Sequence, residues 1–149
     1  MPRVTVHIGR TLGLEVVERQ DGSSLLAWEA VPEYGFPTAG GQVLHGGMVS
    51  WLLDSAMGHA CWSVLSPDEV FLTADLRVEF YRATRMGRVT AKGSVVTRTR
   101  RLVFCSAELF DAQGRLLASG RCTQTVLPGE GHAGRSDPGA GLDEDDARG

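Results

Sequence analysis

A single carboxylate, Asp54, lies within the most apolar stretch of the chain, and His45-Gly46-Gly47 stands just before that stretch. A buried carboxylate has a raised pKa and can serve as a general base. Glycine amides in a first helical turn lack intrahelical partners and can stabilise an oxyanion. The same residues also have structural interpretations: Asp54 could cap a loop or bond to Ser50, and the glycines could simply relieve crowding at a loop–helix junction.

Other catalytic chemistries are disfavoured. No G-x-S-x-G motif supports a serine nucleophile, and the four histidines do not form a metal-ligand pattern, so we expect no metal site. The three cysteines are an odd number without a C-x-x-C pair, which argues against a disulfide framework and favours the cytoplasm. Cys61 and Cys122 fall in apolar patterns and are predicted core residues.

The 149 residues predict one domain built from strands around one helix. Turn residues Asp21-Gly22 predict a hairpin, and a Gly- and Pro-rich loop follows it. Short links between the later strands favour antiparallel neighbours. The expected strands are 13–18, 25–31, 70–80, 88–99, 102–110 and 115–127, and the expected helix is 46–65.

The helix is apolar nearly all round, so it must be covered on most sides. A curved antiparallel sheet wrapped around it would cover one side, and a second subunit the remainder. The stretch is almost long enough to cross a bilayer, but Asp54 and His59 within it and the lack of flanking basic residues predict a buried helix of a soluble protein.

Residues 70–80 alternate between apolar and polar, which is typical of a half-buried strand. The alternation assigns Val70 and Leu72 to the face that meets the helix, and Phe71 and Thr73 to the opposite face. A bulge, or the geometry of a dimer, would be needed to bring Thr73 to the helix.

The net charge of −3 divides unevenly along the chain. Residues 128–149 carry −4 and many glycines, and they are predicted to be a disordered acidic tail after a domain spanning 1–127. Residues 77–101 carry +7. This basic run is either a set of solvated strand faces or a phosphate-binding rim. A sequence pI of 5.8 without a nucleic-acid motif disfavours nucleic-acid binding.

The run from Val43 through His45-Gly46-Gly47, followed by Asp54 nine residues after the histidine, resembles the hotdog-fold acyl-CoA thioesterases. The phenylacetate-degradation type is the subgroup that the run matches best. The resemblance covers about residues 10–127 and implies an α+β fold with a curved antiparallel sheet wrapped around one long central helix.

The resemblance also implies roles for individual residues. Asp54 matches the family's catalytic carboxylate, which acts as a general base or a nucleophile. Gly46 matches the amide that polarises the thioester carbonyl, and His45 the histidine that sets this turn and the substrate position. Thr73 falls where relatives hold the carboxylate or the water with a hydroxyl. In these enzymes the site lies between two subunits, so Asp54 would face Gly46 of a partner chain.

One position departs from the family pattern, since relatives carry asparagine where this chain has Ala39. Gln42 or Thr38 are the candidate substitutes. Aromatic side chains near the motif are candidates for the acyl pocket, and arginines at the turns are candidates for binding the phosphates of coenzyme A. The expected substrate-binding residues are Gly47, Gln42, Phe36, Trp51, Arg82, Arg85, Arg98 and Arg100.

The sequence therefore predicts a cytoplasmic thioesterase that hydrolyses a small or medium acyl-CoA, aliphatic or aromatic, without a cofactor. It is expected to act as a homodimer or a dimer of dimers, with neither nucleic acid nor membrane as a partner. The alternative is a non-catalytic acyl-CoA-binding or regulatory domain of the same fold. A hydratase is disfavoured because the spacing of His45 and Asp54 does not match that class.

Overall fold

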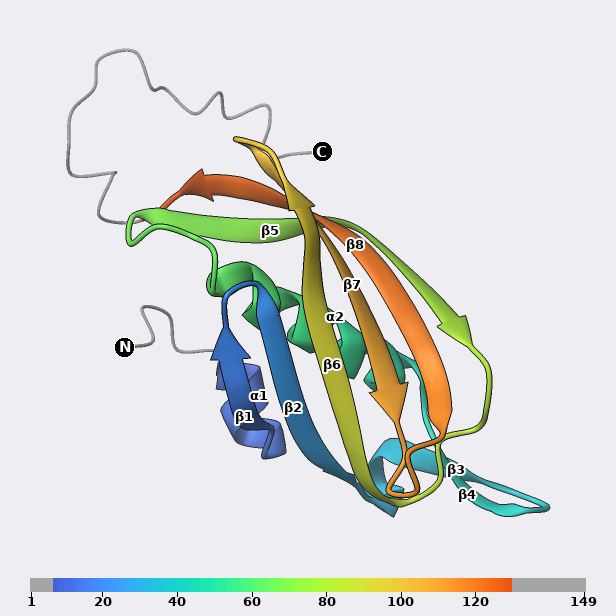
Figure 1. Ribbon diagram of the computed structural model, residues 1–149. Helices are drawn as coiled ribbons and strands as arrows, with labels where there is room; N and C mark the ends of the chain where they lie inside the picture. Colours follow the sequence, from blue (N-terminus) through green and yellow to red (C-terminus); the bar gives the residue numbers. More distant parts are fainter. Residues whose placement is uncertain (1–6, 130–149) are drawn as a thin grey trace, which may run out of the picture.

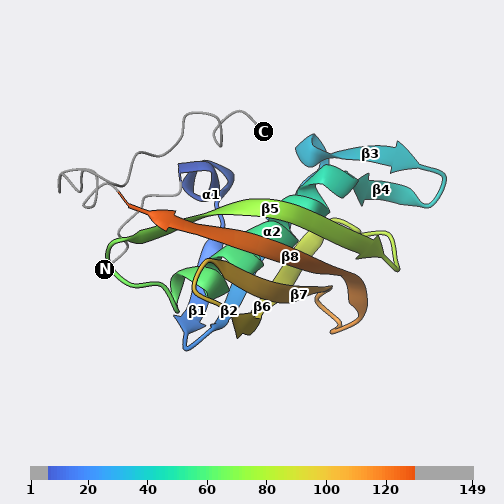
Figure 2. The same cartoon turned by 90° about the horizontal axis from the view of Figure 1, so that it is seen from above.

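The computed structural model describes residues 7–129, and the remainder of the predicted tail lies outside them. Six antiparallel strands form one curved sheet in the order β1-β2-β6-β7-β8-β5, and a single long helix, α2 (Gly46–Trp62), lies along its concave face (Figures 1 and 2). This confirms the predicted architecture. Within residues 7–129, no helix is long and apolar enough to cross a membrane.

The strands fall within two residues of their predicted bounds. The Asp21-Gly22 turn has φ angles of 49° and 81°, the left-handed pair that a tight type I′ hairpin turn requires. The helix ends three residues earlier than predicted, at Trp62. The strands of the sheet are β1 (Glu15–Gln20), β2 (Ser23–Ala30), β5 (Glu69–Phe80), β6 (Gly87–Arg98), β7 (Leu102–Phe110) and β8 (Leu116–Pro128).

Two segments have more regular structure than their sequences indicate. The segment before the helix, expected to be a loop, forms a short 3₁₀ turn (Pro32–Tyr34) and a two-stranded hairpin of β3 (Gly35–Thr38) and β4 (Gly41–Leu44). This hairpin projects from one end of the molecule (Figure 1). A short helix, α1 (His7–Leu12), precedes β1 and was not predicted.

The backbone of α2 lies directly against the backbone of β6 where the helix crosses this strand. A Cβ atom built on Gly93 would lie 2.2 Å from the carbonyl oxygen of Ala56, so only glycine fits there. The hydroxyl of Ser24 donates to that same oxygen at 2.6 Å. Cys61, Cys105 and Cys122 are free and buried in the core, as predicted for Cys61 and Cys122.

Strand β5 contains a bulge that the alternation of its sequence does not reveal. Its pairing with β8 shifts between Thr73 and Asp75. Before the shift Phe71 faces the helix, where its ring lies 4.7 Å from that of Trp62, while Leu72 is 62% exposed. After the shift the even-numbered residues face inward, as the alternation predicts. The predicted orientation was therefore wrong for residues 70–73, because one extra residue inverts the phase of a strand.

Candidate active site

The first turn of α2 is built by His45-Gly46-Gly47. His45 is the N-cap, and its Nδ1 accepts the Gly47 N–H at 2.9 Å. Because Nδ1 is the acceptor, a neutral ring carries its proton on Nε2, which is free to donate. Among residues 7–129, the Gly46 N–H has no acceptor. Of the two glycine amides considered for the substrate, Gly47 is thus engaged in the cap and Gly46 remains open.

Asp54 lies two turns further along α2 and is partly buried. Burial raises the pKa of its carboxyl, and a hydrogen bond from the Thr73 hydroxyl to Oδ1, at 3.1 Å, partly opposes this rise. The bond to Ser50 considered above does not form, because the Ser50 hydroxyl donates to the carbonyl oxygen of Gly46. Asp54 is therefore a carboxylate with a raised pKa and one hydroxyl partner, which suits a general base.

The bulge in β5 is what brings Thr73 to Asp54. Thr73 is directly opposite Gln124 on β8, and Gln124 is fully buried, so both side chains lie on the inner face of the sheet. Without the extra residue Thr73 would face outward with Asp75, whose carboxylate accepts the Thr123 N–H at 3.0 Å. The structure thus contains the bulge that the sequence analysis named as one way to bring Thr73 to the helix.

Gly46 and Asp54 of one chain do not meet at a common carbonyl. Eight residues separate them on one helix, which at about 1.5 Å per residue places them about 12 Å apart along its axis. A general base must lie within about 3 Å of the proton it removes, or one water away. The two groups can act on the same carbonyl only if Asp54 of one chain works with Gly46 of a second chain.

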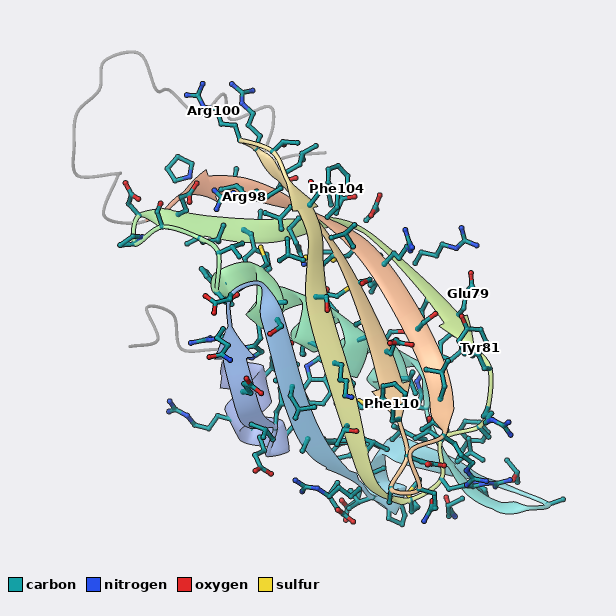
Figure 3. The ribbon with its side chains drawn as sticks, in the orientation of Figure 1. Glu79, Tyr81, Arg98, Arg100, Phe104 and Phe110 are labelled. Atoms are coloured by element: carbon teal, nitrogen blue, oxygen red, sulfur yellow. The ribbon has the colours of Figure 1, made fainter. Side chains whose placement is uncertain are left out.

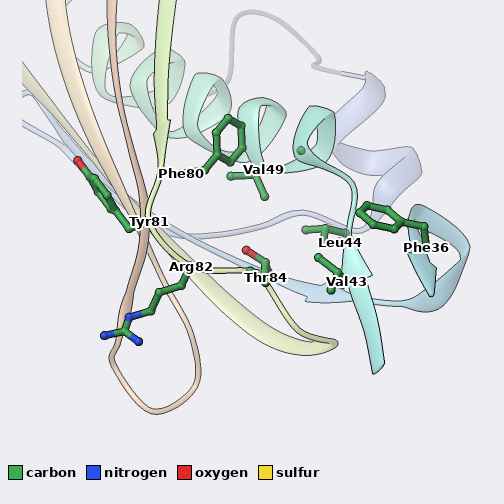
Figure 4. Close-up of a pocket in the computed structure, with 10 residues that line it drawn as sticks. Phe36, Val43, Leu44, Val49, Phe80, Tyr81, Arg82 and Thr84 are labelled. Atoms are coloured by element: carbon green, nitrogen blue, oxygen red, sulfur yellow. The ribbon is translucent and has the colours of Figure 1, made fainter. Parts of the chain in front are cut away.

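A pocket of about 310 Å³ opens beside Gly46, between β4, the end of β5 and the segment that follows it (Figure 4). Phe36, a predicted acyl-pocket residue, lines it together with Phe80, which the sequence analysis did not single out. The only sign that could have revealed Phe80 is its place at the end of a strand that leads back toward the motif. The other lining residues are Val43, Leu44, Val49, Tyr81, Arg82, Ala83 and Thr84.

The remaining predicted site residues are dispersed. Trp51 packs edge-on against Trp28, with centroids 5.5 Å apart, and is not part of the pocket. Gln42 is exposed on the β3–β4 hairpin opposite Pro37. Ala39, the position that departs from the family pattern, is exposed in the turn of that hairpin.

The four arginines fall into two groups at opposite ends of β5. Arg82 lines the pocket, and Arg85 donates to the Gly40 carbonyl oxygen at 3.1 Å, which holds the β3–β4 turn. Arg98 and Arg100 lie at the far end of the sheet (Figure 3). There Arg98 bonds both carboxylate oxygens of Glu69, at 3.0 and 2.9 Å.

One buried polar residue near the site was not singled out from the sequence. Gln124 donates from Nε2 to the Cys122 sulfur at 3.2 Å, and its Oε1 has no partner within residues 7–129. The signal was a polar side chain at an inward position of β8. Within the same residues, no group of three or more histidine, cysteine or acidic side chains could hold a metal ion.

Comparison with known families decides the class of this protein. The family model described as "Thioesterase superfamily" matches residues 41–118, which include the His45 turn, Asp54 and Thr73. The chain belongs to the thioesterase superfamily. This thioesterase is 29% identical to the medium/long-chain acyl-CoA thioesterase YigI of Salmonella typhimurium over 130 residues, covering 78% of the chain and 83% of the relative.

Solved structures agree with this assignment. The conserved protein PA5202 of Pseudomonas aeruginosa superposes with a TM-score of 0.74 at 27% identity, covering 84% of this chain and 97% of that one. The PaaI protein of the phenylacetic acid degradation operon of Escherichia coli gives a TM-score of 0.73 at 19% identity, covering 83% and 86%. The thioesterase therefore has the predicted hotdog fold and is a thioester hydrolase.

Proposed function

We propose that this protein hydrolyses the thioester of a small or medium acyl-CoA, with Asp54 as the catalytic carboxylate and the Gly46 amide as the group that polarises the carbonyl. Two groups on one helix carry the proposal. Asp54 has a raised pKa and its Oδ1 accepts the Thr73 hydroxyl, and the Gly46 N–H at the start of the helix has no acceptor in the described part of the chain. The motif resembles the phenylacetate-degradation subgroup, and the PaaI protein of that operon has the same fold.

The residue types fit a short reaction sequence. The thioester carbonyl oxygen accepts the Gly46 N–H, and the Nε2–H of the adjacent His45 is the proposed second donor. Asp54 takes a proton from water as the water oxygen bonds to the carbonyl carbon, and negative charge develops on the oxygen that faces Gly46. Collapse of this intermediate breaks the C–S bond, and the proton passes to the departing sulfur, which yields free acid and CoA.

A direct attack by the Asp54 carboxylate on the carbonyl carbon is the second route open to the same residues. It expels the CoA thiolate and leaves a mixed anhydride, which water then hydrolyses. The two routes share the Gly46 donor and the ionised form of Asp54. They differ in whether a covalent anhydride forms, and an oxygen of Asp54 enters the product acid only when water attacks the Asp54 carbonyl carbon of that anhydride.

The separation of Gly46 and Asp54 supports a homodimer in which each site uses two chains. Strand β5 is twelve residues long, forms one edge of the sheet, and exposes Leu76 and Phe80 at 40% and 56%. A long edge with exposed apolar side chains is a template for pairing with another strand. Two antiparallel β5 strands related by a two-fold axis would join two sheets along this edge.

We propose a register with a two-fold axis at Leu76, which charge favours over an axis at Arg77. A two-fold axis at Leu76 places Asp75 opposite the partner's Arg77, whereas an axis at Arg77 would oppose two arginines, which is unfavourable. The favoured register lays the Phe80 end of the partner's β5, which packs on its Gly46, beside residues 71–73. Because Thr73 contacts Asp54, the register brings Asp54 toward the partner's Gly46.

The same pairing would place the two groups of arginines near each other across the interface. Arg98 lies beside Glu69 at the start of β5, and Arg82 follows its end. In an antiparallel pair the start of one strand lies beside the end of the other, so Arg98 and Arg100 would approach the partner's Arg82 and Arg85. We propose this edge for the phosphates of CoA, because guanidinium groups match the geometry of phosphate.

A thiol-release assay across a panel of aliphatic and aromatic acyl-CoAs tests the proposal. Wild-type protein should release CoA from at least one member, and Asp54→Asn should abolish this release. Asp21→Asn is the matched control, because it makes the same chemical change in a turn where asparagine is favoured. Binding of acyl-CoA without any turnover would contradict the proposal and favour the non-catalytic acyl-CoA-binding domain.

A further inference from the structure

The pocket beside Gly46 has the composition of a site for an apolar group. Its walls come mainly from aliphatic and aromatic side chains, of which Leu44 and Val49 are each 3% exposed. Thr84 is also 3% exposed, and its hydroxyl points into the pocket and has no hydrogen-bond partner within residues 7–129 (Figure 4). An apolar cavity with one placed polar group is typical of small-molecule sites.

The Phe80 ring lies beside the Gly46 backbone. It is the last residue of β5 and lies opposite buried Ala118, so its side chain is on the inner face of the sheet. A Cβ atom built on Gly46 would be 3.4 Å from Cε1 and 3.5 Å from Cζ of the Phe80 ring. The ring therefore lies directly against the Gly46 backbone, and it forms part of the pocket wall (Figure 4).

We infer that this pocket receives the acyl chain of the substrate and that Phe80 is the residue that limits the chain length it accepts. This inference rests on the proposed function, since it takes the thioester carbonyl to lie at the Gly46 N–H. From that point a chain that enters the pocket must pass along the Phe80 ring, with Phe36 on the hairpin as another aromatic wall.

The alternative occupant, the pantetheine arm of CoA, fits the pocket poorly. Pantetheine carries amide groups that need hydrogen-bond partners, and the peptide groups along this wall are largely engaged. The N–H groups of Tyr81 and Arg82 both donate to the Leu117 carbonyl oxygen, at 2.8 and 3.0 Å, and the Thr84 carbonyl oxygen accepts the Leu44 N–H at 2.8 Å. A buried amide without a partner is costly, whereas an alkyl chain needs none.

The test measures kcat/KM for straight-chain acyl-CoAs from acetyl to palmitoyl. In Phe80→Ala the ratio of the longest to the shortest productive substrate should rise by at least about tenfold, because a single methylene in a hydrophobic pocket already discriminates by that factor. Phe80→Trp should shift preference toward shorter chains. Phe104→Ala is the matched control, since Phe104 alternates with buried Val103 and Cys105 and so lies on the outer face of the sheet, away from the pocket (Figure 3).

The outcomes separate this inference from the proposed function. If wild-type protein turns over acyl-CoAs but Phe80→Ala changes kcat/KM by the same factor for every chain length, Phe80 does not limit length and the inference is overturned. If wild-type protein turns over none of them, the proposed function fails first. Should Phe80→Ala fail to fold, as judged by its circular dichroism spectrum, Phe80→Leu should show a smaller shift in the same direction, and a uniform change in that variant would equally contradict the inference.

Discussion

Replacing Thr73 with valine should move the acidic limb of the pH–rate profile to higher pH. Asp54 acts as a carboxylate, so activity is lost as the pH falls through its pKa, which burial holds above the ordinary range. The hydrogen bond from Thr73 favours the charged form and opposes this rise. Valine has nearly the shape of threonine but cannot donate, so the pKa of Asp54 should rise further and the loss of activity should begin at a higher pH.

The size of the effect follows from the hydrogen bond itself. At 3.1 Å to a charged acceptor it is worth roughly 1.5–3 kcal/mol, and the exposure of Thr73 favours the low end. About 1.4 kcal/mol corresponds to a tenfold change in the ratio of ionised to protonated carboxyl. On the acidic side of the profile, kcat/KM of Thr73→Val should therefore be about tenfold below wild type, with little change on the alkaline plateau.

The assay is kcat/KM for one acyl-CoA, measured across pH by thiol release, with Thr73→Ser as the control that keeps the hydroxyl. The serine variant should follow the wild-type profile. If Thr73→Val lowers kcat/KM by the same factor at every pH, Thr73 positions water or substrate instead and this reasoning about the ionisation of Asp54 is refuted.

Three further predictions concern stability and charge. Asp54→Asn removes a carboxylate whose folded-state pKa is raised, so it should raise the melting temperature at neutral pH by roughly 4 °C per kcal/mol, a gain that disappears as the pH falls through that pKa. Gly93→Ala should cost about 1–3 kcal/mol in urea unfolding, because its Cβ would strike the backbone of α2. A backbone N–H of Ser66 and the guanidinium of Arg98 help to lower the pKa of Glu69 to about 2, so Glu69 stabilises the fold above its ordinary pKa of 4.5 and loses that effect as the pH falls toward 2. Arg98→Ala should accordingly start acid unfolding, followed by circular dichroism, at a higher pH.

The strands and the helix could be predicted closely because their side chains keep a regular period. The alternation over 70–80 and the uninterrupted apolar helix leave little freedom in element type. The hairpin at 35–44 was missed because its glycines and a proline are typical of loops, and its pairing depends on Arg85, which bridges to Val43 and bonds to Gly40 from a distant segment.

The site could be predicted as a set of residues but not as an arrangement. The spacing of His45 and Asp54 identified the start of the helix and the carboxylate within it, yet alternation alone cannot show that an extra residue turns Thr73 inward. The engagement of the Gly47 amide by the His45 ring, and the position of Phe80 against Gly46, depend on contacts across the fold. Arg98 likewise has a partner, Glu69, that charge counting along the sequence could not reveal.

The central claim, that Asp54 of one chain acts with Gly46 of another, is tested most directly by mixing two inactive variants. Gly46→Pro removes the N–H donor at a helix position that tolerates proline, and Asp54→Asn removes the carboxylate. In a heterodimer of these chains one shared site carries both changes and the other carries neither. After unfolding and refolding equal amounts together, thiol release should recover to about a quarter of the wild-type rate, as expected for random pairing of two chains. No activity above that of the separate variants, with heterodimers present by native mass spectrometry, would contradict the account.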